Sequence, residues 1–488
     1  MGDTTISALA NPKHPVNEVL SWDKLLIYGI QHVLAMYVGA VAVPLIVGGA
    51  LKMSQEQLVF LINADLFTCG IATIIQTVGF WKFGIRIPVI QGVTFVCVSP
   101  MIAIGSGIIN DIGPQMSGEQ AAATAMVVIF VSIIISGIFA LLVAPIMGMI
   151  VRLFPPVVTG SVILAIGLNL IGAGLHNFGG QGVYINGQPA QYGDLRFLLI
   201  GFIVVLVVIL GNKFFTGFLK NISVLIGFLV GYIIAIIAGF VSGSEILTAK
   251  VFSVDLPFGL NMPGLGGSWL TAFASPAFGN YLVLSIITFI IVMIITMIES
   301  TGDYIAIGEA IDLPVHEHDI AAGIRADGLS TIIGGCLNAF QYTAFAQNVG
   351  LVAMTGVRSR FVVTTAGVIL VILGLIPKLA AVIASVPAFV IGGAAVVLFA
   401  SVAGNGIKTL AKAELDKKPN NVIIVSLSVA AGLIPVAGGL LSNGNMLPFL
   451  GQLPPAIEPL TTSGISLAAI VAVVLNLFFN GYNKKEKA

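Results

Sequence analysis

The chain has 488 residues, of which 57% are hydrophobic and only 9% are charged. A soluble domain carries about 25% charged residues because its surface must face water, so this composition excludes a water-facing surface and predicts one that faces lipid. The net charge is zero and no basic patch is present, which argues against a nucleic-acid partner.

Apolar segments follow one another along the whole chain. The N-terminal stretch is polar to about residue 20 and has no cleavable signal pattern, so we expect the first apolar run to be retained. A transmembrane helix needs about 20 mostly apolar residues, and eleven uninterrupted segments qualify: 24–47, 56–80, 121–150, 155–175, 195–211, 222–242, 281–303, 361–377, 387–407, 421–440 and 463–481.

Three more segments are apolar but interrupted: 88–107, 319–337 and 339–357. Together the segments predict an all-α integral membrane protein with about fourteen spans. The three cysteines lie in apolar runs and predict neither a disulfide framework nor a metal site.

The loops between these spans carry an asymmetric charge. If the N-terminus is cytoplasmic, 17 of the 21 Lys and Arg residues fall inside and 4 fall outside. This asymmetry follows the positive-inside rule, and one span more or fewer would remove it. We therefore expect a multi-pass protein of the cytoplasmic (inner) membrane with both termini in the cytoplasm.

A short motif recurs with an offset of 232 residues. Its members and their copies are Pro145 and Pro377, Pro155 and Pro387, Val158 and Val390, and Gly160 and Gly392. With seven spans per half, the second copy enters the membrane from the opposite side, as in the inverted repeats of secondary transporters. The interrupted segments 88–107 and 339–357 are then the third and tenth spans, and such paired broken spans predict a substrate site where they meet.

Two carboxylates lie in the long apolar run after residue 281. Glu299 and Asp303 are spaced i, i+4 and share one face of the predicted helix. Carboxylates inside a membrane are costly and usually mark a substrate or proton pathway. The simpler alternative, chiefly for Asp303, is a helix end that reaches the interface. A neutral Glu offers both a donor and an acceptor, which suits the edge of a nucleobase.

Two other polar residues have open interpretations. Asp327 lies near an expected membrane boundary, where it either pairs with Arg325, caps a short helix or serves transport. His32 lies within the first span as an interior histidine bonded to a neighbouring helix or as a proton relay. His316 and His318 lie beside acidic residues and indicate a solvated loop rather than a metal site.

Each broken span also carries one phenylalanine, Phe95 or Phe345. A single membrane phenylalanine usually packs in the core or faces lipid, but matching positions suggest a clamp for a flat ring, because a base stacked on an aromatic side chain gains about 1–3 kcal/mol. The polar residues of the two segments are Gln91, Thr94, Gln341, Thr343, Gln347 and Asn348.

The segment from Gln347 to Gly356 resembles the signature of the nucleobase–ascorbate transporter family. That signature is Q/E/P-N-x-G-x-x-x-x-T followed by a basic residue or Gly, and every fixed position is present. The stretches QHVLAMYVGAVAVPL, ESTGDYIAIGEA and RADGLSTIIGG also resemble this family, and the resemblance extends from about residue 22 to 482.

The resemblance implies a 7+7 inverted repeat with short extended segments in the broken spans, as in uracil permeases, sulfate permeases and anion exchangers. It implies a core domain of residues 1–151 (spans 1–4) and 281–385 (spans 8–11). It also implies a gate domain of residues 152–280 (spans 5–7) and 386–488 (spans 12–14 and a cytoplasmic tail). Proton symport, an elevator-type movement and a homodimer held through the gate domains are implied in the same way. No enzymatic activity, metal or cofactor is expected.

The same resemblance assigns roles to individual residues. The expected substrate-binding residues are Glu299, Gln347, Phe95, Phe345, Thr94 and the main chain of Ala346. The residues expected to couple protons or to support the site are Asp303, Asp327, Asn348 and His32.

Gln347 favours a purine as the cargo. Uracil permeases typically carry Glu at this position and vitamin C carriers carry Pro, whereas a glutamine amide suits the adjacent C=O and N–H of an oxidised purine. Many xanthine carriers have Pro where Gln341 stands, and some xanthine-selective members have Asn where Thr94 stands. Xanthine is the first expectation, and uric acid, hypoxanthine and guanine stay open. The alternatives are a uracil or pyrimidine permease and an anion carrier of the same fold.

Overall fold

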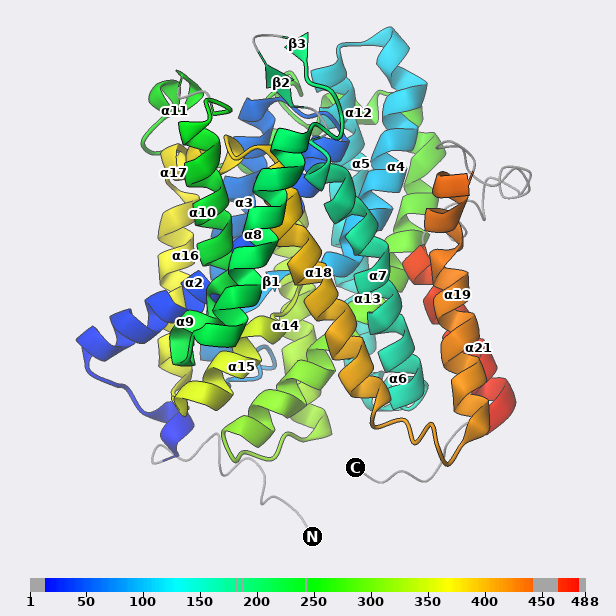
Figure 1. The fold of residues 1–488 in the computed structure, drawn as a ribbon. Coiled ribbons are helices and arrows are strands. Elements are labelled where there is room, and N and C mark those ends of the chain that lie inside the picture. The colour runs from blue at the N-terminus through cyan, green and yellow to red at the C-terminus, as the bar shows by residue number, and fades with distance from the viewer. Residues whose placement is uncertain (1–13, 181–182, 186–187, 242–243, 442–463, 482–488) are drawn as a thin grey trace.

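Long helices cross the structure from end to end (Figure 1). The structure, a computed structural model, describes residues 14–180, 183–185, 188–241, 244–441 and 464–481. Within these residues eight helices are long and apolar enough to cross a membrane, a bent pair of helices forms a ninth candidate, and three apolar helices are shorter. The expected all-helical, multi-pass architecture is confirmed.

The first half of the chain contains these elements: η1 Pro15–Asn17, α2 Trp22–Ala50, α3 Gln55–Val78, β1 Gln91–Val93, η2 Phe95–Cys97, α4 Val98–Ile112, η3 Gly113–Gln115, α5 Gly118–Val143, η4 Ala144–Ile146, α6 Met147–Val151, α7 Pro156–Phe178, β2 Tyr184–Ile185, β3 Gln188–Pro189, α8 Leu195–Phe214, α9 Gly217–Asn221, α10 Ser223–Ile237 and α11 Ser244–Thr248. The second half contains η5 Pro257–Gly259, α12 Trp269–Phe273, α13 Pro276–Ala310, α14 Glu317–Cys336, β4 Tyr342–Ala344, α15 Ala346–Thr355, α16 Arg360–Gly374, α17 Pro377–Ala384, α18 Ala388–Leu410, α19 Pro419–Leu441 and α21 Gly464–Asn480.

Several expected spans differ in length from the observed helices. The expected span 121–150 ends early, because α5 stops at Val143 and a 3-10 turn and α6 follow. The expected span 361–377 is divided into α16 and α17, whose axes differ by 82°. In contrast, α13 continues to Ala310, beyond the expected limit of 303. Residues 1–13 and the expected tail at 482–488 lie outside the described residues.

The motif found by the offset of 232 residues marks two matching helices. Pro155 and Pro387 are the extended residues that directly precede α7 and α18, and each helix is 23 residues long. Proline is favoured at a helix start because the first N–H groups of a helix have no intrahelical partner, so its lack of an N–H costs no hydrogen bond. The motif therefore starts the same helix twice.

Helices α7 and α18 pack against each other in opposite directions. A Cβ on Gly167 of α7 would lie 2.4 Å from the Ala403 backbone nitrogen of α18, and a Cβ on Gly392 would lie 2.1 Å from that of Phe178. Small residues at these positions allow the two backbones to approach closely, as is common between membrane helices. The early part of each helix thus meets the late part of the other.

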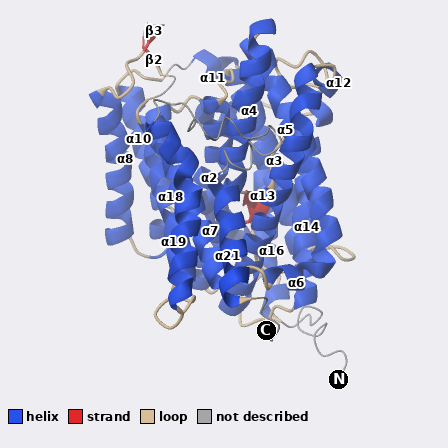
Figure 2. Ribbon diagram, turned by 90° about the vertical axis from the view of Figure 1, so that its right-hand side faces the viewer, coloured by secondary structure: helices blue, strands red, loops and turns tan. Residues whose placement is uncertain are grey.

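The two broken spans meet as a pair of short strands in the middle of the molecule (Figure 2). In this antiparallel pair Gln91 lies opposite Ala344 and Val93 lies opposite Tyr342. Main-chain bonds extend the pair at both ends, from Thr94 N to Gln341 O (2.9 Å) and from Phe345 N to Ile90 O (3.0 Å). Such non-helical backbone inside a membrane protein is tolerated where protein buries it, and both strands are fully buried.

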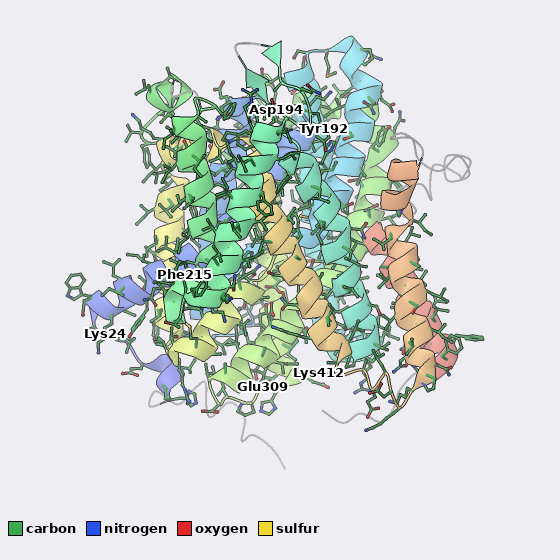
Figure 3. All side chains as sticks on the ribbon, in the orientation of Figure 1. Lys24, Tyr192, Asp194, Phe215, Glu309 and Lys412 are labelled. Carbon is green, nitrogen blue, oxygen red and sulfur yellow. The ribbon has the colours of Figure 1, made fainter. Side chains whose placement is uncertain are left out.

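Several charged side chains lie at the two ends of the helix bundle, away from the buried carboxyls of its interior. Figure 3 shows Glu309 and Lys412 at the end of the molecule where the described chain begins and α21 finishes, and Asp194 at the opposite end. This distribution fits a protein whose middle is surrounded by lipid.

Candidate substrate site

Glu299 lies well inside α13, next to the strand pair. The following residue, Ser300, bonds Thr343 of β4 (Oγ to Oγ1, 2.9 Å) and accepts a bond from the Ala344 N–H (3.1 Å). On the other side, the Thr94 hydroxyl interacts with the Glu299 carboxylate. The structure therefore brings together Glu299 and Thr94, two residues that the sequence placed in one site.

The helix-end alternative for Glu299 and Asp303 does not hold, because α13 continues to Ala310. Both side chains are largely buried, and one carboxylate oxygen of each has no hydrogen-bond partner in the part of the chain that the structure describes. Asp303 is close enough to Glu299 and Asp327 to interact with both electrostatically. A buried polar atom without a partner calls for a functional explanation.

Asp327 lies in the middle of α14 and is fully buried, so neither the Arg325 pairing nor the helix cap describes it. The Tyr304 hydroxyl lies 2.8 Å from each Asp327 carboxylate oxygen, and Gln76 Nε2 donates at 2.7 Å. Asp327 thus joins α14 to α13 and α3. Tyr304 and Gln76 were not among the predicted site residues, although Tyr304 directly follows Asp303 in the chain.

Phe95 and Phe345 also lie side by side, as the matching broken spans suggested. Their ring centroids are 6.0 Å apart and the rings are tilted by 52°. Phe399 of α18 packs edge-on against Phe95 at 5.6 Å. This third ring could not be predicted, because Phe399 lies in an ordinary apolar helix far from any motif.

The second strand leads directly into the start of α15. Phe345 precedes that helix without forming a side-chain cap, and Ala346 and Gln347 are its first two residues. The first N–H groups of a helix have no intrahelical partner, so the main chain at Ala346 and Gln347 can donate to a bound carbonyl oxygen. The Gln347 side chain faces a small cavity next to Phe345.

His32 and Asn348 join α2 to α15. The Asn348 amide nitrogen lies 3.0 Å from His32 Nδ1 and donates to the His32 carbonyl oxygen at 3.0 Å. Of the two interpretations of His32, the structure therefore supports an interior histidine that is bonded to a neighbouring helix. This contact fixes the start of α15 and with it Gln347.

Two polar side chains of the broken spans have few contacts. Both side-chain polar atoms of Gln91 and the Oε1 atom of Gln341 lack partners among the described residues, and both residues are fully buried. Gln341 Nε2 contacts only the Met293 sulfur, at 3.0 Å. The described residues contain no group of His, Cys, Asp and Glu that could hold a metal ion.

The site is closed in this structure. A cavity of about 40 Å³ lies beside Phe345 and Gln347, and one of about 10 Å³ lies beside Glu299. Since a water molecule occupies about 30 Å³ in the liquid, neither cavity holds a purine. Both are lined on one side by helices α7, α9, α10 or α18 and on the other by α2, α13 or the start of α15.

A sequence profile described as the Permease family matches residues 23–440. The uric acid transporter UacT of Escherichia coli is 41% identical over 472 residues, which cover 96% of this chain and 89% of that protein. A xanthine permease of Bacillus subtilis is 41% identical over 466 residues, or 95% of each chain.

Solved structures show a related fold at low sequence identity. The transmembrane domain of the cyanobacterial bicarbonate transporter BicA aligns with a TM-score of 0.55 and 13% identity, covering 93% of this chain and 98% of that one. The murine anion transporter Slc26a9 aligns with a TM-score of 0.61 and 11% identity, covering 98% and 73%. These two structures support the fold and leave the cargo open.

Proposed function

The chain belongs to the nucleobase–ascorbate transporter family of permeases, and from this premise we propose that it imports purine nucleobases together with protons. It is a transporter and not an enzyme. Xanthine and uric acid are the first candidates for its cargo, because close relatives are named for them. Hypoxanthine and guanine are further candidates.

The observation that carries the proposal is the set of unused hydrogen-bonding groups beside two aromatic rings. Among the described residues one Glu299 oxygen has no hydrogen-bond partner, no Phe345 side-chain bond caps the start of α15, and Gln347 lines a cavity. A purine offers N–H and C=O groups along its edges and a flat face for the rings, so a few fixed polar groups in an apolar site suit it.

Proton coupling would follow from the buried carboxylic acids. A carboxyl in an apolar site favours its neutral form, and a neutral Glu299 both donates and accepts at a purine edge. In the proposed cycle the proton and the purine bind from the outside, with Asp303 and Asp327 supporting the proton step. Both are released after the site has become accessible from the cytoplasm.

The movement proposed is that of an elevator in a 7+7 inverted repeat. The core domain of residues 1–151 and 281–385 would carry the strand pair, and the gate domain of 152–280 and 386–488 would stay in place. Two such chains would form a homodimer in the inner membrane through their gate domains, with both termini in the cytoplasm. The antiparallel contact of α7 with α18 supports the repeat, and the edge-on contact of Phe399 with Phe95 supports an interface between the two domains.

An anion carrier is the alternative suggested by the solved structures with a related fold. The lining of the site argues against it, because neither the cavity beside Gln347 nor the one beside Glu299 is lined by a Lys or Arg that would attract an anion. Competition separates the two functions: purines should reduce uptake of labelled xanthine, whereas sulfate and bicarbonate should not.

The proposal is tested by uptake of labelled xanthine and uric acid into cells or vesicles that contain the protein, with and without a proton gradient. We expect uptake that collapses when an uncoupler is added. Uptake that ignores the uncoupler would remove proton symport from the proposal, and no uptake of any purine would remove the cargo.

A further inference from the structure

A buried carboxyl in α3 has no role in the site described above. Asp65 lies near the middle of α3 and is 0% exposed. None of the ion pairs among the described residues includes it. Since an ionisable residue inside a membrane is costly and usually functional, its contacts indicate what it does.

The strongest contact of Asp65 is with the second strand. The Tyr342 hydroxyl donates to Asp65 Oδ1 at 2.8 Å, and the Cys69 thiol lies 3.8 Å from the same oxygen. Asp65 Oδ2 has no hydrogen-bond partner among the described residues. The carboxyl of α3 is therefore an acceptor for β4.

Tyr342 connects two helices across the core. Its N–H donates to Thr331 Oγ1 of α14 at 3.2 Å. Its ring lies directly on the same helix, because a Cβ on Gly334 would be 2.6 Å from a ring carbon. With the hydroxyl on Asp65, the side chain spans from α14 to α3 and fixes the first residue of β4.

A shift at Tyr342 would reach the site after only three residues. The chain runs from Tyr342 through β4 to Phe345 and then to Gln347. The other face of β4 is bonded to Ser300, the neighbour of Glu299. The position of Phe345 and Gln347 relative to Glu299 thus depends on both attachments of the strand.

The first strand begins in a similar way but is supported differently. The Gln91 N–H donates to Thr73 Oγ1 of α3 at 3.0 Å, which matches the bond from Tyr342 to Thr331. However, no described hydrogen bond holds the Gln91 side chain. The Gln91 side chain lies close enough to Asp327 and Tyr304 to interact with them. Among the described residues, however, a side-chain hydrogen bond from the first strand residue to the opposite helix is present in β4, from Tyr342 to Asp65.

We propose that Asp65 is a positioning residue of the purine site, which accepts the hydrogen bond of Tyr342 and so sets where Phe345 and Gln347 stand relative to Glu299. The proposal rests on the proposed function, because it concerns the same site. It requires an acceptor oxygen at position 65 and assigns no proton transfer to it.

Three variants test this role by uptake of labelled xanthine. Asp65→Asn keeps an acceptor oxygen of the same geometry and should keep the wild-type KM. Asp65→Ala and Tyr342→Phe should each raise KM roughly three- to tenfold, the effect of one lost hydrogen bond, with little change in Vmax or in sensitivity to an uncoupler. The double variant should be no worse than either single variant, because both remove the same bond.

Ser136→Ala is the matched control, since this buried hydroxyl bonds only its own helix, at Ile133 O (2.8 Å). It should leave KM unchanged. Membrane abundance and melting temperature are measured for every variant. If Asp65→Ala does not accumulate in the membrane, the test rests on the KM values of Tyr342→Phe and Asp65→Asn. Each of these variants changes one polar group and keeps the shape of the side chain.

A wild-type KM in Tyr342→Phe would overturn the proposal, and so would an Asp65→Asn variant with a raised KM or with uptake that no longer responds to the proton gradient. Failure of the proposed function has a different signature. In that case the wild-type protein itself takes up no purine.

Discussion

At the scale of single residues, the central expectation concerns Glu299. Replacing Glu299 with Gln keeps the size of the side chain. The carboxyl becomes an amide, which can neither bind nor release a proton. We expect uptake of xanthine to fall at least about a hundredfold, as is usual when a positioned acid or base is lost. Uptake by membrane vesicles measures this.

Glu309→Gln is the control for that variant, because Glu309 is exposed at the end of the same helix. It should transport like the wild type. Normal accumulation of xanthine by Glu299→Gln would exclude Glu299 from the mechanism.

Asp255 predicts a pH dependence of stability. It lies in the loop before η5, outside the membrane spans, and burial raises its pKa from 3.8 to about 7 because the charged form loses water. Between those values the folded protein keeps a proton that the unfolded chain has released, so the free energy of unfolding falls as the pH rises. Asp255→Asn should remove this fall and melt at a higher temperature than the wild type at about pH 8, with the difference shrinking toward about pH 4.

The pKa of Asp194, at the same end of the molecule, is shifted in the opposite direction. Hydrogen bonds from Arg196 lower the pKa of this half-buried carboxyl. Asp194→Asn should therefore melt at a lower temperature than the wild type above about pH 4, and the difference should shrink as the pH falls below that value. Equal pH profiles of melting for Asp255→Asn and the wild type would contradict the account of Asp255.

The residue scale also shows where the sequence was informative. Glu299, Asp327 and Gln347 were found because charged or amide groups are rare in apolar runs and because one motif is specific. Asp65 offered the same signal within the expected span 56–80 but lay outside every motif. The contacts of Tyr342 and Phe399 could not be predicted, since both depend on which helices meet in space.

At the scale of elements, helix pairing depends on glycines at the contact of α7 with α18. Gly167→Ala places a methyl group 2.4 Å from the Ala403 backbone nitrogen, so the helices must separate. Overpacking of this kind costs about 1–3 kcal/mol. We expect a lower melting temperature of the purified protein.

Gly404→Ala, in α18 itself, is the matched control, because a Cβ there meets no atom within 4 Å. Alanine favours a helix over glycine by about 1 kcal/mol, so this variant should be as stable as the wild type or more so. If both variants melt alike, the close approach does not limit stability.

The positions of most helices could be predicted from runs of apolar residues, and the offset of 232 residues found the matching starts of α7 and α18. The helix ends were less predictable. Apolar sequence continues through the bend between α16 and α17, and it gives no sign that α13 runs on to Ala310. The pairing of β1 with β4 could not be predicted either, because their hydrogen bonds link segments about 250 residues apart in the sequence.

At the scale of the whole molecule, the elevator proposal predicts that joining the core to the gate stops transport. Val38 of α2 and Leu398 of α18 line the same small cavity. In a protein without its three native cysteines, a cysteine pair at these positions should form a disulfide on oxidation and block uptake. Reduction should restore it.

The control is a cysteine pair at Thr77 and Thr364, whose hydroxyls lie 2.8 Å apart between α3 and α16, both within the proposed core. Its oxidation should leave uptake intact. If cross-linking Val38 to Leu398 does not slow uptake, the two sets of helices do not move against each other during the cycle.

The strand pair has a consequence for how this family evolves. Main-chain atoms make the bonds that join β1 to β4 and extend the pair at Thr94 and Gln341. The main-chain bonds at Thr94 and Gln341 therefore do not depend on which side chains these two positions carry. Relatives named for uric acid and for xanthine are each 41% identical to this chain, so these two positions are the first to exchange when the basis of cargo choice in the family is sought.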